Sequence, residues 1–349
     1  MKIGIIGSGK FGLVLASIAM ENNNEVVIFS RRKQEVDSIN TNKKSLSGFS
    51  LEVGNCFATN NHEDLNSCDA LLFTVASKDF RSTIDQIQHN SKQGKFVSCI
   101  KGFDQSTGKL MTEVLVDEYA LSPKDVLVLS GPNLSKELYN KELTGTVIAG
   151  DDSDFIDSLS NALKTDFFIP FSSSDRYGVE LGGAMKNIYA ILSGYFHQKN
   201  VGENTIGLLL TRCLAEMSVY GKARGANSET FLGLSGVGDF FSTALSKDSR
   251  NYKFGTHLAD GLSPEEALIK VGDTVEGFAT SKIVHQNAQD LGIKLKLLDY
   301  LMSIYEGPKS LEEDKSIFNA SEIEPDSNCL LYTSPSPRDR TRSRMPSSA

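Results

Sequence analysis

The chain has 349 residues, 40% of them hydrophobic and 23% charged, a composition typical of globular proteins and a length sufficient for two domains. Its formal net charge of −8 argues against general nucleic-acid binding, because no basic block outside the extreme C-terminus could neutralise a phosphate backbone. No apolar run approaches the roughly 18 residues of a membrane span. The five cysteines and five histidines show no metal-ligand spacing, so we expect a cytoplasmic protein with reduced thiols and no metal.

The chain begins with a strand, a glycine-rich turn and a helix. The apolar run Lys2–Ile6 leads into Gly7-Ser-Gly-Lys-Phe-Gly12, and a helical pattern then extends to Glu21. A second strand is predicted at Glu25–Ser30, which completes a βαβ unit. In this context the glycine pattern indicates dinucleotide binding.

Each glycine of the turn has an expected purpose. Gly7 permits the tight turn, Gly9 the close approach of a pyrophosphate, and Gly12 the packing of helix on strand. The phosphates should lie at the helix N-terminus, next to the turn that holds Ser8.

The end of the second strand bears on the choice of cofactor. A carboxylate at this point bonds a ribose hydroxyl, whereas a guanidinium suits a 2′-phosphate. Here the strand is followed by Arg31 and Arg32, with no Asp or Glu at the tip. The pattern favours NADP and leaves NAD possible; a solvated basic turn is the alternative.

Strand and helix patterns then alternate, which predicts an α/β domain with a doubly wound, mainly parallel, Rossmann-like sheet. The further strands are expected at Ala70–Val75, Phe96–Ile100, Val126–Leu129, Thr146–Ala149 and Phe167–Pro170, and the helices at Phe80–His89, Lys109–Glu118 and Phe155–Leu163. Ligands of such sheets bind at the carboxyl ends of the strands, which directs attention to Lys101 and to the segment 130–135. Lys101 could hold a phosphate or polarise an oxygen, or lie in an ordinary loop.

From about Asp175 the strand signal stops, and we expect an all-α domain. The predicted boundaries are 1–172 for a dinucleotide-binding domain and 173–325 for a helical substrate and catalytic domain. Helices are expected at Tyr177–His197, Thr205–Ala223, Pro264–Val271, Thr280–Leu291 and Lys296–Tyr305. The glycine-rich segments 232–239 and 249–255 are interpreted as binding loops, in which Asp239 could orient an ammonium group and Arg250 with Asn251 could grip a phosphate. The alternative is that each residue serves as a cap or turn.

The first helix of this domain carries a lysine among apolar residues. Leu181, Met185, Ile188 and Leu192 recur at helical spacing and form one apolar face, with Lys186 one residue off it. Lys186 is either a half-buried general acid or base with a lowered pKa, or a snorkelling surface lysine. The preceding Gly182-Gly183 predicts a close approach, which we interpret as room for the cofactor.

The last segment, 326–349, is rich in Ser, Pro and Arg and has no helical or strand period. We expect it to be disordered. Its composition suggests a non-native extension joined near Asn328, with a basic recruitment tail as the alternative.

Taken together, the motifs resemble the NAD(P)-dependent glycerol-3-phosphate dehydrogenase family of the bacterial kind, over nearly all of the chain to about residue 320. The resemblance rests on Gly7–Gly12, Lys101-Gly102, the segment 130–137, Glu180–Asn187, Gly233–Asp239, Ser249–Asn251 and Val275–Gly277. It implies reversible reduction of dihydroxyacetone phosphate to sn-glycerol 3-phosphate, for glycerophospholipid synthesis. One departure is Asn133, where the family usually has serine.

The resemblance also implies roles for individual residues. Lys186 would be the proton donor and acceptor, with Asp239 beside it as the second catalytic residue. The implied cofactor contacts are Lys10 and Phe11 in the glycine turn and, outside it, Arg31, Lys101, Ser135, Arg250, Thr274 and Glu276. The implied substrate contacts are Lys101, Gly131, Asn133, Lys186, Asp239, Ser249, Arg250 and Asn251.

Two other functions compete with this one. The first is a related two-domain dehydrogenase acting on another small carbonyl compound or 2-hydroxy acid. The second is a non-catalytic NADP-binding protein of the same fold. An exposed apolar helical face would make a homodimer reasonable.

Overall fold

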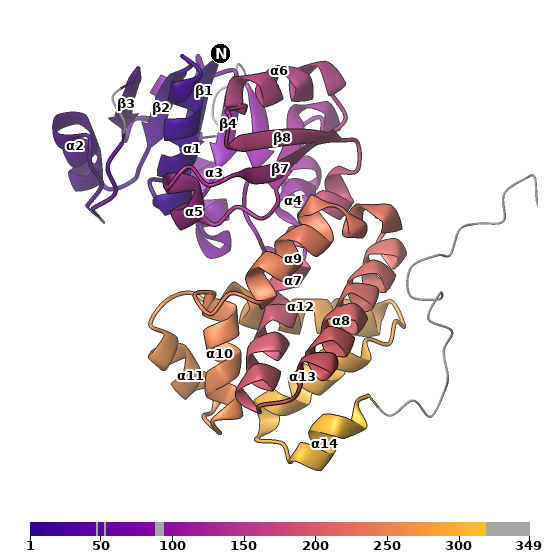
Figure 1. Cartoon of the computed structure of the whole chain (residues 1–349). Helices are drawn as coiled ribbons and strands as arrows, with labels where there is room; N and C mark the ends of the chain where they lie inside the picture. The colour runs from indigo at the N-terminus through magenta and orange to yellow at the C-terminus, as the bar shows by residue number, and fades with distance from the viewer. Residues whose placement is uncertain (47, 52–53, 88–93, 319–349) are drawn as a thin grey trace, which may run out of the picture.

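The computed structural model describes residues 1–46, 48–51, 54–87 and 94–318. Within these ranges the strands form one eight-stranded sheet (Figure 1). The strands are β1 (Lys2–Ile6), β2 (Glu25–Phe29), β3 (Cys56–Thr59), β4 (Ala70–Phe73), β5 (Lys95–Ser98), β6 (Val126–Ser130), β7 (Thr144–Ala149) and β8 (Phe168–Ser173).

The strand order is β3-β2-β1-β4-β5-β6-β7-β8, so β1 lies between β2 and β4. Neighbouring strands are parallel except for β6 and β7, which are antiparallel. The chain thus folds into the predicted doubly wound, mainly parallel Rossmann-like sheet. The ends of β1, β2 and β4 meet at one edge, where the glycine turn follows β1.

Helices cover both faces of this sheet because its strands are apolar on both sides. Ile3 and Ile5 pack with one set of helices, while Ile6 packs on the opposite face, as the period-two alternation of a strand requires. The helices are α1 (Lys10–Glu21), α2 (Lys33–Asn42), α3 (Phe80–Ile87), α4 (Met111–Asp117), α5 (Ser135–Tyr139) and α6 (Ser153–Leu163). The predicted last two residues of α3, 88 and 89, lie outside the described residues.

The sequence interpretation assigned no element between Arg31 and Ala70, whereas the structure has α2 and β3 there. Both elements have weak sequence patterns. The helix α2 buries only Glu35, Val36 and Ile39, and β3 is a four-residue strand at the edge of the sheet.

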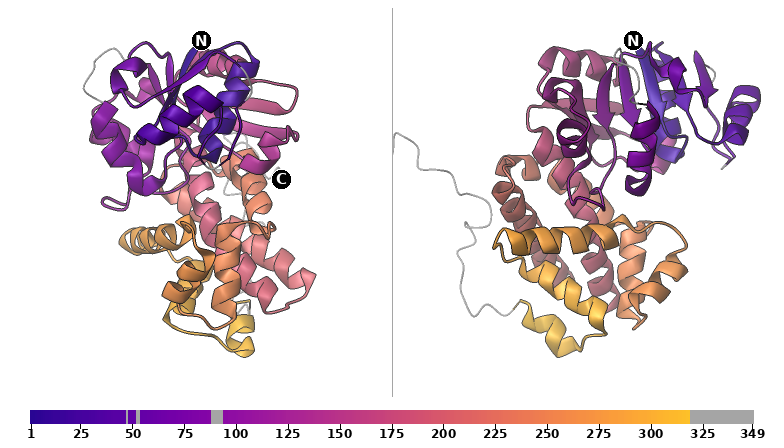
Figure 2. Two further views of the ribbon diagram at one scale, coloured as in Figure 1. Left: turned by 90° about the vertical axis from the view of Figure 1, so that its left-hand side faces the viewer. Right: turned by 180° about the vertical axis from the view of Figure 1, so that it is seen from behind.

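The C-terminal part is helical and is organised around α7 (Figures 1 and 2). Its helices are α7 (Arg176–Gln198), α8 (Glu203–Ala223), α9 (Asp239–Ala244), α10 (Arg250–Ala259), α11 (Pro264–Val271), α12 (Glu276–Asp290), α13 (Lys296–Glu306) and α14 (Leu311–Ser316). The prediction of a single apolar face on α7 was wrong, because every residue from Gly178 to Phe196 is buried. A helix that is enclosed on all sides has no solvent face to keep polar.

The expected binding loops at 232–239 and 249–255 are mostly helical, which corrects the sequence interpretation. A π-helical turn, η5 (Leu234–Gly238), leads into α9, and Ser249 caps α10 by accepting a hydrogen bond from the Tyr252 N–H at 3.3 Å. The glycines here serve packing. A Cβ on Gly255 would lie 1.9 Å from the Ile191 carbonyl oxygen of α7, so α10 and α7 touch through their backbones.

The described part of the helical domain ends in the short helix α14. Gly307 follows α13, and Ser310 with Glu313 forms a capping box at the start of α14. The predicted tail, 326–349, lies outside the described residues. No helix in the described ranges is both long enough and apolar enough to cross a bilayer.

Candidate active site

The turn between β1 and α1 has the shape of a phosphate cradle. Gly7 adopts a φ of +115°, and a Cβ on Gly12 would lie 2.3 Å from the Gly7 carbonyl oxygen, so both positions require glycine. A Cβ on Gly9 would meet no atom within 4 Å, and no side chain caps α1 at this position. Open space therefore lies in front of the N–H groups that begin α1, which fits the pyrophosphate of a dinucleotide.

The side chains of this turn differ in exposure. Ser8 is buried and donates a hydrogen bond from its hydroxyl to Ser30 Oγ at 2.9 Å, which ties the turn to the end of β2. Lys10 is exposed and Phe11 is half-buried.

Both arginines after β2 are paired with carboxylates. The Arg31 Nη2 atom lies 2.9 Å from Asp79 Oδ1, and the Arg32 Nη2 atom lies 3.5 Å from Glu35 Oε2. The tip of β2 thus lacks an acid in the sequence, but the fold brings two acids to it.

A cluster of charged and polar groups surrounds Asp239, which is 1% exposed, and joins the sheet to the helical part. Its carboxylate contacts two ammonium groups: Lys186 of α7 donates to Oδ1, and Lys101, which follows β5, donates to Oδ2 at 2.6 Å. Lys186 also donates to Thr243 Oγ1 at 2.7 Å, and Lys101 to the Gly131 carbonyl oxygen at 2.8 Å. Four of the predicted site residues therefore meet directly.

Burial and charge act in opposite directions on Lys186, which is 5% exposed. Burial lowers the pKa of its ammonium group below the usual lysine value, the Asp239 carboxylate opposes this, and the nearby Lys101 charge adds to the lowering. The net direction of the pKa is downward, because the effect of burial is the largest of the three. The sequence interpretation left this balance open.

Asn251, predicted to contact substrate, links three helices. Its Nδ2 donates to Asn187 Oδ1 at 2.8 Å, and its Oδ1 accepts from the Gly277 N–H at 2.9 Å. Asn187 is the neighbour of Lys186 on α7, so this amide network holds the starts of α10 and α12 beside the lysine.

The remaining predicted contacts lie around this core. Arg250 is half exposed and pairs with Asp273 at 3.1 Å, and Glu276 accepts a hydrogen bond from Ser77 at 2.8 Å. The structure places Ser135, Ser249 and Thr274 in half-buried positions. No direct contact joins Arg250 to Lys186 among the interactions that the structure describes.

Asn133 has unused hydrogen-bonding capacity. Its Nδ2 donates to Thr146 Oγ1 at 2.9 Å, while its buried Oδ1 has no partner in the described part of the chain. The nearby Ser130 hydroxyl is likewise buried without a partner.

Comparison with known proteins agrees with this geometry. The profile described as "NAD-dependent glycerol-3-phosphate dehydrogenase N-terminus" matches residues 2–156, and the corresponding C-terminus profile matches residues 175–314. The chain belongs to the NAD-dependent glycerol-3-phosphate dehydrogenase family.

Individual members of the family align along most of the chain. It is 36% identical over 314 residues to a glycerol-3-phosphate dehydrogenase [NAD(P)+] of Pseudomonas fluorescens, covering 89% of this chain and 88% of the relative. Identity to the Pseudomonas aeruginosa protein of the same name is 37% over 309 residues, covering 87% and 90%. The crystal structure of glycerol-3-phosphate dehydrogenase from Coxiella burnetii superposes with a TM-score of 0.81 at 27% identity, covering 91% of this chain and 97% of that one.

The paired glycines of α7 do not leave the space that the sequence interpretation gave them. In this family member a Cβ on Gly182 would lie 2.6 Å from the Ser235 carbonyl oxygen, and one on Gly183 would lie 2.4 Å from Ser130 Oγ. The protein's own atoms fill both positions. These glycines allow η5 and the end of β6 to pack on α7, instead of making room for a cofactor.

Sequence reasoning missed several residues of the site. Thr243 lies four residues after Asp239 on α9, so their shared helix face was a usable signal once α9 was recognised as a helix. Ser77 donates to Glu276 across 199 positions of sequence, and nothing local could have predicted that pair.

Glu180 was seen only as the start of the lysine motif, yet its buried carboxylate joins α7 to the sheet domain. It accepts hydrogen bonds from the Thr112 hydroxyl at 2.5 Å, the Thr112 N–H at 3.2 Å and the Ser98 hydroxyl at 3.2 Å. Ser98 ends β5, three residues before Lys101. Glu180 therefore joins the helix that carries Lys186 to the strand that leads to Lys101.

Burial raises the pKa of Glu180 to about 7, against 4.5 for the free carboxyl group. A raised folded-state pKa gives stability that is full below pH 4.5 and lost as pH rises through about 7. We expect Glu180→Gln to gain stability relative to wild type across this window, on the order of 3 kcal/mol. Thermal unfolding from pH 5 to pH 8 tests this, with exposed Glu265→Gln as the control; a difference that does not change with pH would contradict it.

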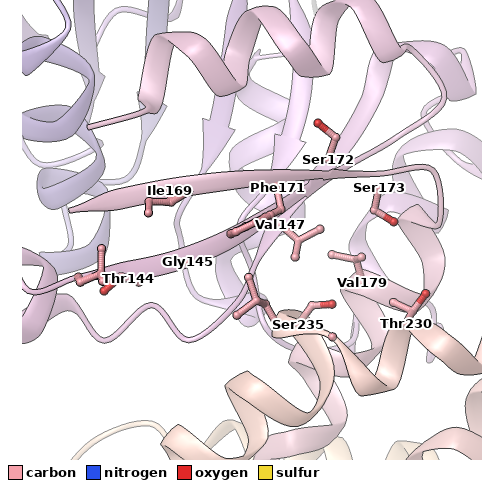
Figure 3. A pocket seen from close by; sticks show the side chains of 13 residues that line it. Thr144, Gly145, Val147, Ile169, Phe171, Ser172, Ser173, Val179, Thr230 and Ser235 are labelled. Carbon is pink, nitrogen blue, oxygen red and sulfur yellow. The ribbon is translucent and has the colours of Figure 1, made fainter. Parts of the chain in front are cut away.

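An apolar cavity of about 660 Å³ lies away from the lysine cluster, between β7, β8 and the segment that carries Thr230 and Ser235 (Figure 3). Val147, Phe171 and Val179 line it, and none of its lining residues is titratable. It therefore offers no group for acid–base chemistry. Among the described residues, no group of three or more His, Cys, Asp or Glu side chains could hold a metal ion.

Proposed function

We propose that the chain is an NAD(P)-dependent glycerol-3-phosphate dehydrogenase, which reduces dihydroxyacetone phosphate reversibly to sn-glycerol 3-phosphate. The observation that carries this proposal is the buried Lys186, held by Asp239 at the junction of the two parts of a chain in this family. Its ammonium group is a proton donor in a nearly water-free position, which carbonyl reduction requires.

The described residues fit a nicotinamide dinucleotide, because the open space before Gly9 and the N-terminus of α1 suit a pyrophosphate. When bound, the reduced cofactor supplies the hydride for the carbonyl carbon. Lys186 donates a proton to the developing alkoxide and takes it back in the reverse reaction. Its lowered pKa brings proton donation and proton acceptance closer to balance at neutral pH.

Asp239 keeps Lys186 in place and favours its charged form. Lys101 shares this carboxylate at 2.6 Å and is only partly buried, so its ammonium is available to a substrate oxygen or phosphate. Asn133 offers its unpartnered Oδ1 as an acceptor for a substrate hydroxyl. Gly131 contributes the carbonyl that orients Lys101.

The remote phosphate would be held by Arg250 with Ser249 and Asn251. Among the described residues, Arg250 is held by an exposed pair with Asp273, and solvent screening makes such a pair weak enough for the guanidinium to turn to a dianion. We expect Arg250→Ala to raise the KM for dihydroxyacetone phosphate by about 10- to 100-fold, because a charge-assisted hydrogen bond is lost. The exposed Lys253→Ala on the same helix is the matched control. An unchanged KM would favour a dehydrogenase for an unphosphorylated 2-oxo acid.

The direct test follows the absorbance of NADPH and NADH with purified protein and dihydroxyacetone phosphate. Oxidation of either cofactor that depends on this substrate supports the proposal. Cofactor binding without turnover would instead indicate a non-catalytic NADP-binding protein.

We propose NADP as the preferred cofactor, with NAD also accepted, because Arg31 and Arg32 follow β2. The proposed cofactor contacts are Gly7, Ser8, Gly9, Lys10, Phe11, Gly12, Arg31, Arg32, Lys101, Ser135, Arg250, Thr274 and Glu276. We further propose domains at 1–172 and 173–325, a cytoplasmic homodimer, and a role in supplying glycerol 3-phosphate for phospholipid synthesis.

A further inference from the structure

The Arg31 guanidinium is held by Asp79, a residue of the short helical turn that follows another strand of the sheet. Arg31 follows β2, and Asp79 lies after β4, on the far side of β1 in the sheet order. Arg31 Nη2 lies 2.9 Å from Asp79 Oδ1, and Nη1 donates to Ser82 Oγ at 3.1 Å. The contact therefore spans the end of β1, from which the turn Gly7–Gly12 begins.

The backbone holds Asp79 firmly in this place. It ends the short helical turn η2 (Ser77–Asp79), where its N–H donates to the Ala76 carbonyl oxygen at 2.9 Å. Its own carbonyl oxygen accepts from the hydroxyls of Ser82, at 3.0 Å, and Thr83, at 2.7 Å. The carboxylate is thus presented to Arg31 by a fixed turn.

Asp79 and Ser82 accept hydrogen bonds from the same Arg31 nitrogens that a 2′-phosphate would need. A guanidinium binds phosphate through parallel N–H groups, and both terminal nitrogens of Arg31 are already engaged. Arg32, the other cation at this tip, faces the buried Glu35. A cofactor with a 2′-phosphate must therefore compete with carboxylates for the arginines.

We propose that Asp79 is a specificity-determining residue, which limits the preference of this chain for NADP(H) over NAD(H) by competing with the 2′-phosphate for Arg31. This inference rests on the proposed function. A phosphate ester with a charge of about −1.5 to −2 is repelled by the carboxylate, in addition to losing its partner. The 2′-hydroxyl of NAD(H) is uncharged, so neither effect applies to it.

The exposure of the pair sets the size of the effect. The Arg31 and Asp79 side chains are 42% and 37% exposed, so solvent screens their interaction. We expect Asp79→Asn to lower the Kd for NADPH by about two- to fivefold and to leave the Kd for NADH nearly unchanged. The effect should shrink at high salt, because exposed charges are screened.

The experiment measures Kd for NADPH and NADH by the fluorescence of the reduced nicotinamide, with the full-length protein and no substrate. Asp85→Asn is the matched control, since it removes one negative charge from α3, the helix that directly follows Asp79, and Asp85 accepts a hydrogen bond from the Tyr119 hydroxyl. The double variant Arg31→Met, Asp79→Asn closes a cycle with the single variants. In the Arg31→Met background, the effect of Asp79→Asn on NADPH binding should largely disappear.

Four results would overturn the inference. Weaker NADPH binding by Asp79→Asn would mean that Asp79 orients Arg31 for the phosphate. An equal gain for both cofactors, or the same gain in Asp85→Asn, would mean a general charge effect. If wild-type protein binds neither cofactor, the proposed function itself fails, whereas normal wild-type turnover with no effect of Asp79→Asn removes this inference alone.

Discussion

Lys186→Ala should lower kcat for dihydroxyacetone phosphate reduction by about 10²- to 10⁴-fold, the usual contribution of a general acid. The physical reason is that no other described ammonium group touches Asp239 from inside the helical part; Lys101 approaches from the sheet side and is also bound to the Gly131 carbonyl oxygen. The Kd for NADPH should stay nearly unchanged, because the predicted phosphate cradle lies at α1. Steady-state kinetics and a fluorescence titration provide the two measurements.

The fold should survive this change, since Lys101 still neutralises Asp239 in the variant. Lys186→Met, which fills the same volume without charge, is the control for a cavity, and it should lose as much activity as Lys186→Ala. The rate of reduction by wild type should fall as pH rises through a pKa below that of ordinary lysine, because the acid must be protonated. A near-wild-type kcat in either variant would remove Lys186 from the mechanism.

The N-terminal half was predictable from sequence because its signals are local. The run Lys2–Ile6, the glycines and the strand Glu25–Phe29 follow one another within a single βαβ unit, and each constrains its neighbour. The edge strand β3 gave no such signal, since it has four residues and pairs with a single strand, β2, within the described ranges.

In the helical half, glycines had to be interpreted without knowledge of the distant segments that pack against them. The glycines around Gly236 and Gly255 indicated loops, whereas they permit close contact with Phe231 and with α7. Local propensity disfavours glycine in helices by about 1 kcal/mol, and tertiary packing overrides it here. Sequence spacing alone does not reveal which distant backbone will lie against a glycine.

In the site, too, local features could be predicted from the sequence and long-range contacts could not. The side-chain chemistry of Lys186 and Asp239 was sufficient to propose them as catalytic residues. Their contact could not be predicted, because it joins α7 to α9 across 53 positions of sequence. The pairing of Arg31 with Asp79 crosses 48 positions. The sequence has no acid at the tip of β2, but the fold brings Asp79 there. Chemistry could be predicted from residue types, whereas electrostatic partners depend on the order of the strands.

Gly255→Ala should destabilise the protein by about 3 kcal/mol or more, as overpacking against a rigid backbone does. The added Cβ would lie 1.9 Å from the Ile191 carbonyl oxygen and 2.8 Å from the Tyr195 amide nitrogen, so α10 must move away from α7. That movement would also displace Asn251, which holds Asn187 next to Lys186, so activity should fall at temperatures where the protein is still folded.

Gly207→Ala is the matched control, because Gly207 lies within α8 and a Cβ there would meet no atom within 4 Å. Alanine is the better helix former, so this variant should gain up to about 1 kcal/mol. Thermal unfolding of both variants makes the comparison, with kcat measured well below each Tm. Equal stability of the two variants would show that α7 and α10 are not packed as closely as described, and the positioning of Asn251 by that contact would fall with it.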